Sequence, residues 1–387
     1  MLCDSGFSGK LTGWFAENRR YMPWREDPTP YHVWVSEIML QQTRVDTVLP
    51  YYFRFMEALP DLKSLAECEE ERLLKLWEGL GYYSRVRNLQ KAAITVLAEY
   101  GGNLPKDPAA LQKLPGIGSY TAGAILSIAF GLPEPVVDGN VLRVIMRVNG
   151  CYDDIKAPET KKKLENELRE FLLKEGCDPS AFNQGLMELG ALICVPNGKP
   201  LCASCPVKAA CEAQKMGLTE VLPVTGARES HKNAQITVLI LKDGKTIGIR
   251  KNSEKGLLSG LYGLPRLEGH LSPDEIIKLL SEAGYQPGSV KPLPSAKHVF
   301  THITWEMNAY LVELEGPAPD AAKTDIFNGP TDKSAGRNPE GGETGDKDTW
   351  NRENAELTDL RFVDVETLER DIPLPQAFRK WDFSKII

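Results

Sequence analysis

The sequence predicts a multidomain protein, in which an all-α domain is followed by an α+β domain. The chain has 387 residues, more than a single hydrophobic core usually organises. Apolar residues recur at helical spacing up to about residue 220, and the pattern changes to strands after about residue 225. We therefore place the α-helical domain at 1–222, a linker at 223–233 and the α+β domain at 234–387.

Helix starts in the first domain follow from capping residues. Asp107 and Asp178 are each followed by proline, which combines an N-cap with the residue best suited to the first helical position. Small and apolar residues then predict helices at about 107–113, 119–130, 138–148 and 178–194.

The second domain has strand and turn signals. Residues 234–241 and 246–250 are β-rich runs joined by K-D-G-K, which predicts a hairpin. A third run, 298–312, is expected to be one strand, and Ser272 to begin a helix that ends near Ala283. Residues 316–355 are rich in glycine, proline and charge, so we expect a disordered insertion there.

Composition excludes few classes of function. Hydrophobic residues make up 42% and charged residues 26%, as in ordinary globular proteins. No apolar run approaches the roughly 20 residues that span a bilayer, and no secretory signal is visible, so we expect a cytoplasmic protein without a membrane partner. The net charge of −7 does not indicate a nucleic-acid partner, although a local basic surface is compatible with it.

The stretch L-P-G-I-G-S-Y-T-A-G (114–123) lies between two predicted helices. No strand precedes it and its third glycine is at 123, so it is not a dinucleotide fingerprint. A turn with Gly116 and Gly118 can present backbone N–H groups at a helix start, which is typical of a phosphate site. The simpler alternative is a hairpin whose glycines serve only packing.

Four of the eight cysteines fall within 18 residues, in the pattern C-x7-C-x2-C-x5-C. In an intracellular chain such a cluster favours a metal over disulfides. The spacing matches neither a zinc ribbon nor a bacterial ferredoxin, and from spacing alone zinc and an iron–sulfur cluster remain open. The four residues are Cys194, Cys202, Cys205 and Cys211.

Two carboxylates occupy unusual surroundings. Glu37 lies among apolar residues in W-V-S-E-I-M-L-Q-Q-T (34–43), where a raised pKa would suit a proton donor. The alternative is an exposed residue of an amphipathic helix capped by Ser36. Asp138 in P-V-V-D-G-N precedes a helix, whose positive end would keep it ionised beside a developing cation. The alternative is an N-cap, a role compatible with catalysis.

These pieces together resemble the helix-hairpin-helix DNA glycosylase superfamily, and within it the adenine DNA glycosylases of the MutY type. The motifs are W-V-S-E-I-M-L-Q-Q-T-R-V (34–45), G-L-G-Y-Y-S-R-V-R-N-L (79–89), L-P-G-I-G (114–118), V-V-D-G-N-V (136–141) and the four cysteines. The resemblance covers the chain except 316–355. It implies a helix-hairpin-helix at 107–130 that grips DNA phosphate, and a 4Fe–4S cluster on the loop 194–211, although the first gap has seven residues where six is commonest.

The resemblance also implies roles in the reaction. Glu37 protonates adenine and later activates water, Asp138 stabilises the sugar cation, and Asn140 positions these groups. Tyr120 stands where strand-cutting relatives have a Schiff-base lysine, so no strong lyase step is expected. It is expected to line the pocket and bond to the catalytic aspartate. Further residues expected by resemblance are Gln42 and Tyr82 as wedges in the duplex, and Arg25 and Leu40 in the adenine pocket.

The second domain resembles the MutT-like, Nudix-type domain of this family. Gly269 and Glu275 match the start of the Nudix signature, but Ala283-Gly284 replaces the Arg-Glu pair and the metal-binding glutamates do not follow. We therefore expect a reader of the lesion and not a hydrolase. Phe300-Thr301-His302 resembles the family's recognition loop for 8-oxoguanine, with threonine where serine is usual; the alternative is a plain strand edge.

The expected function is base excision repair by a monomeric, monofunctional DNA glycosylase. Its expected substrate is double-stranded DNA with adenine opposite 8-oxoguanine or guanine. One alternative is an endonuclease III-like glycosylase/lyase for oxidised pyrimidines. Another is a non-catalytic iron–sulfur DNA-binding module.

Overall fold

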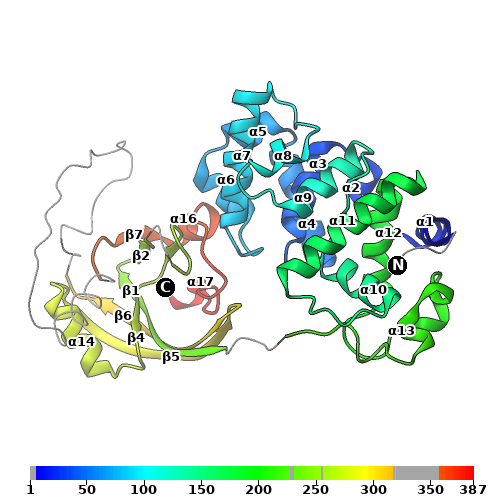
Figure 1. Cartoon of the computed structure of the whole chain (residues 1–387). Helices are drawn as coiled ribbons and strands as arrows, with labels where there is room; N and C mark the ends of the chain where they lie inside the picture. Colours follow the sequence, from blue (N-terminus) through cyan, green and yellow to red (C-terminus); the bar gives the residue numbers. More distant parts are fainter. Residues whose placement is uncertain (1–5, 227–230, 254–255, 317–318, 320–356) are drawn as a thin grey trace, which may run out of the picture. The chain divides into compact units, whose positions relative to one another are not determined.

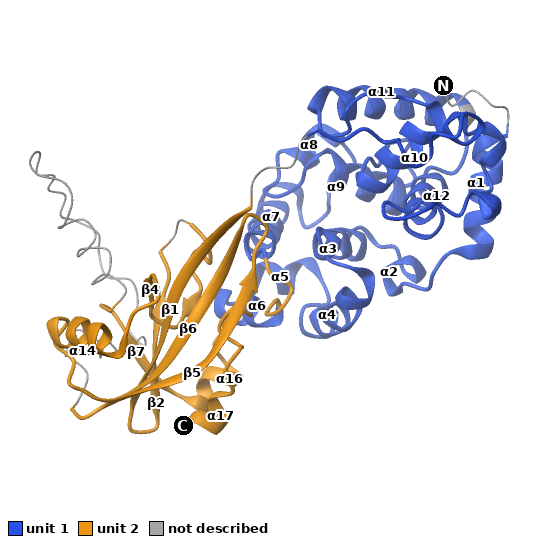
Figure 2. Cartoon of the chain, turned by 90° about the horizontal axis from the view of Figure 1, so that it is seen from below, with its two compact units in different colours: residues 1–76, 82–228 blue, residues 77–81, 229–387 orange. Residues whose placement is uncertain are grey.

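The computed structural model describes residues 6–226, 231–253, 256–316, 319 and 357–387. The chain forms two compact units: unit 1 comprises 1–76 with 82–228, and unit 2 comprises 77–81 with 229–387 (Figure 2). The predicted insertion at 316–355 lies outside the described residues, apart from Gly316 and Pro319. No helix in the part of the chain described is long and apolar enough to cross a membrane.

Unit 1 is helical, which confirms the predicted class of the first domain (Figure 1). Its core joins the N-terminal helix to the last long helices through residues such as Phe7, Val141 and Phe182. Its α-helices are α1 (Phe7–Asn18), α2 (Pro23–Glu26), α3 (Pro30–Leu40), α4 (Val45–Ala58), α5 (Leu62–Glu67), α6 (Glu70–Leu76), α7 (Ser84–Tyr100), α8 (Pro108–Gln112), α9 (Ser119–Ala124), α10 (Gly139–Asn149), α11 (Pro158–Glu175), α12 (Pro179–Leu192) and α13 (Glu212–Lys215).

Helix α3 begins before the residue that the sequence suggested as a cap. Thr29 caps it by accepting a hydrogen bond from the backbone N–H of His32, and Pro30 takes the first helical position. Ser36 is therefore inside the helix, where its hydroxyl donates to the Val33 carbonyl. Glu37 is only 5% exposed, so the alternative of an exposed amphipathic position is wrong.

The predicted helix at 119–130 is two segments. Helix α9 continues into one turn of π-helix, η1 (Ile125–Ala129), before the loop that leads to Asp138. Single π-turns inside helices are frequent at functional sites. Asp138 caps α10, since its Oδ1 accepts from the backbone N–H of Val141 at 2.7 Å, as the sequence predicts.

Unit 2 is a mixed sheet with helices on both faces, which confirms the α+β prediction. Strand β1 pairs in parallel with β6 and antiparallel with β2 and β4. Alternate residues of β1 enter separate cores: Val238 packs with the C-terminal helices, and Leu239 packs with α14 (Figure 1). The elements are β1 (Lys232–Asp243), β2 (Thr246–Lys251), β3 (Tyr262–Gly263), β4 (Arg266–Glu268), α14 (Pro273–Glu282), β5 (Pro287–Val299), β6 (Ile303–Leu314), β7 (Arg361–Asp364), α16 (Val365–Arg370) and α17 (Phe383–Ile386).

The single strand predicted at 298–312 is wrong. Strand β5 ends at Val299, and β6 begins at Ile303 and runs back antiparallel. The backbone N–H of Phe300 donates to the Ile303 carbonyl at 2.8 Å and closes the turn. Residues 300–302 contain neither glycine nor proline, so the sequence carries no turn signal there.

Candidate active site

A pocket in unit 1 brings together residues far apart in the sequence. Glu37 comes from α3, Tyr120 from α9, and Asp138 and Asn140 from the start of α10. All four predicted catalytic residues line this pocket, and the predicted adenine-pocket residues Arg25 and Leu40 line it too. The charged and titratable residues on its wall are Arg20, Arg25, Glu37, Arg44, Asp46, Tyr120, Asp138 and Glu188.

Glu37 has the electrostatics of a proton donor. Burial raises its pKa to about 7, and the neighbouring Asp138 carboxylate adds to the increase. The hydrogen bond from Tyr120 and the positive charge of Arg25 act in the opposite direction. A carboxyl group with a pKa near 7 is protonated in a substantial fraction of molecules at neutral pH and can serve as a general acid.

Asp138 is held by two hydrogen bonds. Its Oδ1 accepts from the backbone N–H of Val141, and its Oδ2 accepts from Asn140 Nδ2 at 2.7 Å. Asn140 is fixed in turn, since its Oδ1 accepts from Arg143 Nη2 at 2.8 Å. The carboxylate therefore stays in one orientation at the N-terminus of α10, where the helix dipole favours a negative charge.

The expected hydrogen bond between the Tyr120 hydroxyl and Asp138 is not formed, and this prediction is wrong. The hydroxyl donates to Glu37 Oε2 at 2.5 Å and also contacts the sulfur of Met187 at 3.6 Å. The Asp138 oxygens already accept from Val141 and Asn140, whereas the buried Glu37 carboxyl offers an acceptor. Burial and the nearby carboxylates raise the pKa of Tyr120 well above its ordinary value, which keeps it a neutral donor.

Arg20, Gln184 and Glu188 are among the residues of the pocket wall that sequence reasoning missed. Glu188 is 1% exposed and accepts hydrogen bonds from two arginines of the wall, Arg20 and Arg25. Gln184 Oε1 accepts from Arg25 Nε at 2.9 Å. A signal was present, because Gln184 and Glu188 are polar residues four positions apart in an otherwise largely apolar helix.

The helix-hairpin-helix formed by α8 and α9 needs two of its glycines for different reasons. Gly116 has φ +77°, and a Cβ atom there would lie 2.8 Å from Asn88 Cβ. Gly123 has no room for a side chain, because a Cβ atom would lie 2.2 Å from the Pro135 carbonyl oxygen. Gly118 has an ordinary φ of −94° and open space around its Cα. The hairpin thus packs tightly on the loop before Asp138 and leaves Gly118 open to approach.

The two predicted wedge residues share a strained backbone. Gln42 has φ 56° and Tyr82 has φ 46°, which is uncommon for residues other than glycine. Arg85 lies between their loops: its Nη1 donates to the carbonyls of Ile38 and Gln41 at 2.7 Å, and its guanidinium carbon lies 5.5 Å from the Tyr82 ring centre. Tyr82 is 46% exposed, which suits a side chain that contacts a partner.

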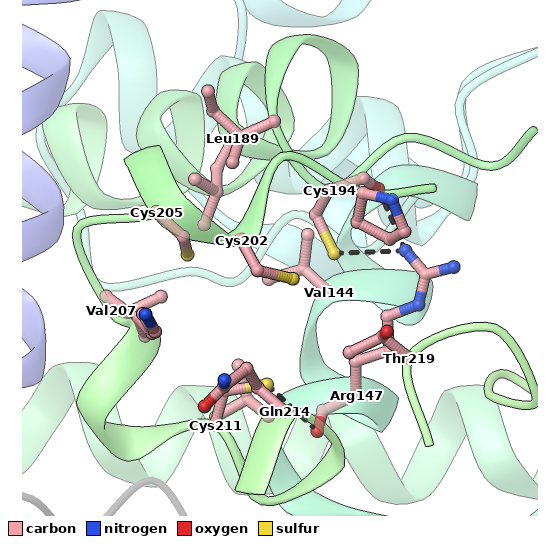
Figure 3. Close-up of a pocket in the computed structure, with 14 residues that line it drawn as sticks. Val144, Arg147, Leu189, Cys194, Cys202, Cys205, Val207, Cys211, Gln214 and Thr219 are labelled. Carbon is pink, nitrogen blue, oxygen red and sulfur yellow. Dashed lines mark hydrogen bonds between the residues drawn. The ribbon is translucent and has the colours of Figure 1, made fainter. Parts of the chain in front are cut away.

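The four clustered cysteines line a second pocket, beside α10 and α12 (Figure 3). None of them forms a disulfide. Arg147 donates from Nη1 to Cys194 Sγ at 3.2 Å, and Arg143 donates from Nε to the Cys194 carbonyl at 2.7 Å. Arg143 therefore connects the cysteine pocket to Asn140 and, through it, to Asp138.

The donor set fits a guest larger than one metal ion. A zinc ion holds each thiolate at about 2.3 Å, which draws the sulfurs close together. Among the residues that the structure describes, no group of three or more Cys, His, Asp or Glu side chains is arranged to hold a single metal ion. The four thiols nevertheless surround one apolar space, as a cluster with a separate iron for each thiolate requires (Figure 3).

The predicted recognition triplet forms the turn between β5 and β6 of unit 2. The Phe300 ring packs edge-on between His298, at 4.5 Å, and Trp305, at 4.8 Å. Thr301 and His302 are exposed at the tip of the turn, so the interpretation as a plain strand edge does not hold. Glu275 of the partial Nudix signature accepts hydrogen bonds from Ser272 in a capping box, a structural role.

The helical unit, with its hairpin and with a buried acid in the same pocket as the aspartate that caps α10, defines a DNA glycosylase of base excision repair. Residues 35–172 match the HhH-GPD superfamily of base excision DNA repair proteins, and residues 236–381 match the NUDIX domain. The chain belongs to the adenine DNA glycosylase family and is therefore a DNA N-glycosylase.

Family membership is based on long alignments with curated proteins. The adenine DNA glycosylase of Homo sapiens is 36% identical, over 81% of this chain and 68% of its own length. The adenine DNA glycosylase of Mus musculus is 45% identical, over 82% of this chain and 72% of its own length. That of Buchnera aphidicola subsp. Acyrthosiphon pisum (strain APS) is 34% identical, over 80% and 87%. Among solved structures, a thermostable thymine-DNA glycosylase is 28% identical, covers 54% of this chain and 95% of its own, and has a TM-score of 0.49.

Proposed function

We propose that the protein hydrolyses the N-glycosidic bond of adenine mispaired with 8-oxoguanine or guanine in duplex DNA. The observation that carries this proposal is the buried Glu37, whose pKa is raised to about 7 in a pocket that also holds Asp138. A base inside the duplex cannot reach such a pocket, so the adenine must first leave the stack.

Glu37 donates its proton to adenine N7, which makes the base a neutral leaving group. The sugar then acquires oxocarbenium character, as in glycoside hydrolysis. Asp138, fixed by Val141 and Asn140, stabilises this cation electrostatically. Once ionised, Glu37 accepts a proton from the attacking water, which completes hydrolysis.

Tyr120 makes the enzyme monofunctional. A lysine at this position would form an imine with the sugar and lead to strand cleavage, whereas a phenol cannot. Its hydroxyl instead donates to Glu37, and burial keeps it protonated. Strand breaks should therefore follow base loss only after alkali.

The remaining residues act on the DNA. Gly116 and Gly118 allow the hairpin backbone to approach a phosphate of the duplex. Gln42 and Tyr82 wedge into the duplex around the lesion, and Arg25 and Leu40 line the adenine pocket. In unit 2, Phe300, Thr301 and His302 recognise 8-oxoguanine, and the proposal is supported by the exposure of Thr301 and His302 at the turn between β5 and β6. The protein acts as a monomer.

Cys194, Cys202, Cys205 and Cys211 would hold a 4Fe–4S cluster, one thiolate to each iron. Such a cluster supplies rigid cross-linking of the loop 194–211 and a redox-active centre. The chain prepares the position through Arg147, which donates to the Cys194 sulfur, and Arg143, which donates to the Cys194 carbonyl.

The test is a panel of duplexes with adenine opposite 8-oxoguanine, guanine or thymine, and thymine glycol opposite adenine. Free base and strand breaks are recorded separately, with and without alkali. Adenine release from the first two duplexes, with breaks mainly after alkali, is expected. Release of thymine glycol with direct breaks would instead support an endonuclease III-like activity, and binding without release would support a non-catalytic role.

A further inference from the structure

Glu188 is a buried anion with no part in the reaction described so far. It is 1% exposed, and both of its oxygens accept hydrogen bonds. Arg20 donates to it from its backbone N–H at 3.0 Å, from Nε at 2.8 Å and from Nη2 at 3.1 Å, and Arg25 donates from Nη2 at 3.0 Å. Although burial acts to raise its pKa, these bonds and the positive charge of Arg25 lower it to about 2, so Glu188 stays ionised.

Arg25 is fixed on the wall of the pocket that contains Glu37. Its side chain is 7% exposed, and each of its guanidinium nitrogens has a different acceptor. Nη2 donates to Glu188, Nε to Gln184 Oε1 at 2.9 Å, and Nη1 to the Arg20 carbonyl at 3.0 Å. A buried cation needs a counter-charge, and Glu188 supplies it through a direct contact.

Arg25, one member of this pair, acts directly on the charge of Glu37. Besides Arg25 and Glu188, the titratable groups that line the pocket from every element are Arg20, Arg44, Asp46, Tyr120 and Asp138. Of those acting on Glu37, Tyr120 and Arg25 favour the ionised carboxylate and Asp138 favours the protonated acid. Without Glu188, no carboxylate of a described residue would contact Arg25 and offset the positive charge that Arg25 exerts on Glu37.

We propose that Glu188 is a positioning residue that holds Arg25 in place and neutralises it, so that Glu37 keeps its proton at neutral pH. The proposal rests on the role of Glu37 as the acid in the proposed function. It gives a role to a buried carboxylate of the pocket wall that the proposed reaction does not use.

The variant Glu188→Gln tests this proposal, because glutamine keeps the shape and an acceptor oxygen but removes the charge. Single-turnover adenine release from a duplex with adenine opposite 8-oxoguanine is measured from pH 5.5 to 9. An opposite charge within a few ångströms shifts a carboxyl pKa by about one unit or more. The alkaline limb of the plot of release rate against pH should therefore move to lower pH by about one unit. Adenine release then becomes about tenfold slower at pH 8 and changes little at pH 6.

Two further variants make the result specific. Arg25→Gln, which keeps Glu188, should move the alkaline limb in the opposite direction, to higher pH. Glu70→Gln is the matched control: Glu70 pairs with Arg87 at 2.6 Å but does not line the pocket, so the wild-type profile is expected. Arg25→Gln also keeps the proposal testable if Glu188→Gln does not fold.

The outcomes separate the two proposals. An equal loss of rate at every pH in Glu188→Gln, or an unmoved limb in Arg25→Gln, would show that Glu188 is only structural and would overturn the inference. Wild-type protein that releases no adenine from this duplex would overturn the proposed function instead. Opposite shifts in the two variants, with the control unchanged, are the expected result.

Discussion

Three carboxylates of unit 1 show how position decides what one chemical group does. Burial raises the pKa of Glu37 to about 7, two arginines hold that of Glu188 at about 2, and two hydrogen-bond donors orient Asp138. The sequence contains 53 acidic residues, and spacing alone did not distinguish these three. The motif resemblance selected Glu37 and Asp138, whereas the spacing within α12 marks Glu188 only as a polar residue and does not reveal its contact with Arg25 of α2.

The raised pKa of Glu37 implies a cost to stability at alkaline pH. The folded state holds the proton more tightly than the unfolded chain, so this contribution to stability is complete below about pH 4.5 and is lost as pH rises through about 7. Glutamine carries no charge at any pH. The free energy of unfolding of Glu37→Gln minus that of wild type should therefore increase by about 2 kcal/mol when the pH is raised from 5 to 8. Urea unfolding at both pH values measures the difference, and a difference independent of pH would contradict the burial argument.

At the scale of single elements, capping residues predicted helix starts well, and turns without glycine or proline were missed. Asp107, Asp138 and Asp178 each cap a helix, as predicted from local hydrogen-bonding chemistry. The turn at 300–302 was not predicted, because continuous β-forming residues cross it and only long-range strand pairing reverses the chain. The tight packing of Gly123 on Pro135 likewise involves residues whose contact the sequence does not reveal.

Gly123→Ala should disturb the hairpin and the loop that leads to Asp138. The new methyl would lie 2.2 Å from the Pro135 carbonyl oxygen, so backbone must move, at a cost of about 1–3 kcal/mol. Adenine release should slow as well, because the loop positions Asp138. Gly13→Ala is the matched control, since it adds the same methyl to a helix with nothing within 4 Å. Equal thermal stability of the two variants would contradict this packing argument.

Arg85→Met should loosen both loops that carry the proposed wedge residues. Methionine cannot donate to the carbonyls of Ile38 and Gln41 at the end of α3, and each buried acceptor left unpaired costs about 1–3 kcal/mol. Affinity for a mismatched duplex should fall in a binding titration. Arg87→Met removes a neighbouring arginine whose ion pair with Glu70 is more exposed, and should change stability by less than about 1 kcal/mol. Similar losses of stability and of duplex affinity in both variants would contradict the proposal that Arg85 holds the two loops in place.

For the whole molecule, sequence periodicity predicted the order and class of the two domains, and the comparisons support both. The kind of reaction was inferred from motifs that lie far apart in the sequence. No local pattern predicts that residues such as Glu37 and Asn140 line the same pocket. The network from Cys194 through Arg143 to Asn140 was not predicted, since arginines on a helix usually face water.

Cys202→Ser should remove the proposed cluster without altering the rest of the helical core. Serine is a poor ligand for iron, and the loop 194–211 contains only short helical turns of its own. Iron and sulfide should fall from about four per chain to near zero, as measured chemically together with the visible absorption. Cys68→Ser, outside the cysteine pocket, is the control and should keep both. Wild-type protein that contains no iron, and whose four thiols bind zinc instead, would contradict the proposed cofactor.

The central claim is that Glu37 donates the proton that releases adenine. Its most direct test compares wild type with Glu37→Gln for single-turnover adenine release and for binding of the same duplex, with adenine opposite 8-oxoguanine. Loss of general acid catalysis predicts release slowed by at least about 10²–10⁴-fold, with binding nearly unchanged. Release by Glu37→Gln within tenfold of wild type, or a loss of binding as large as the loss of release, would contradict the claim.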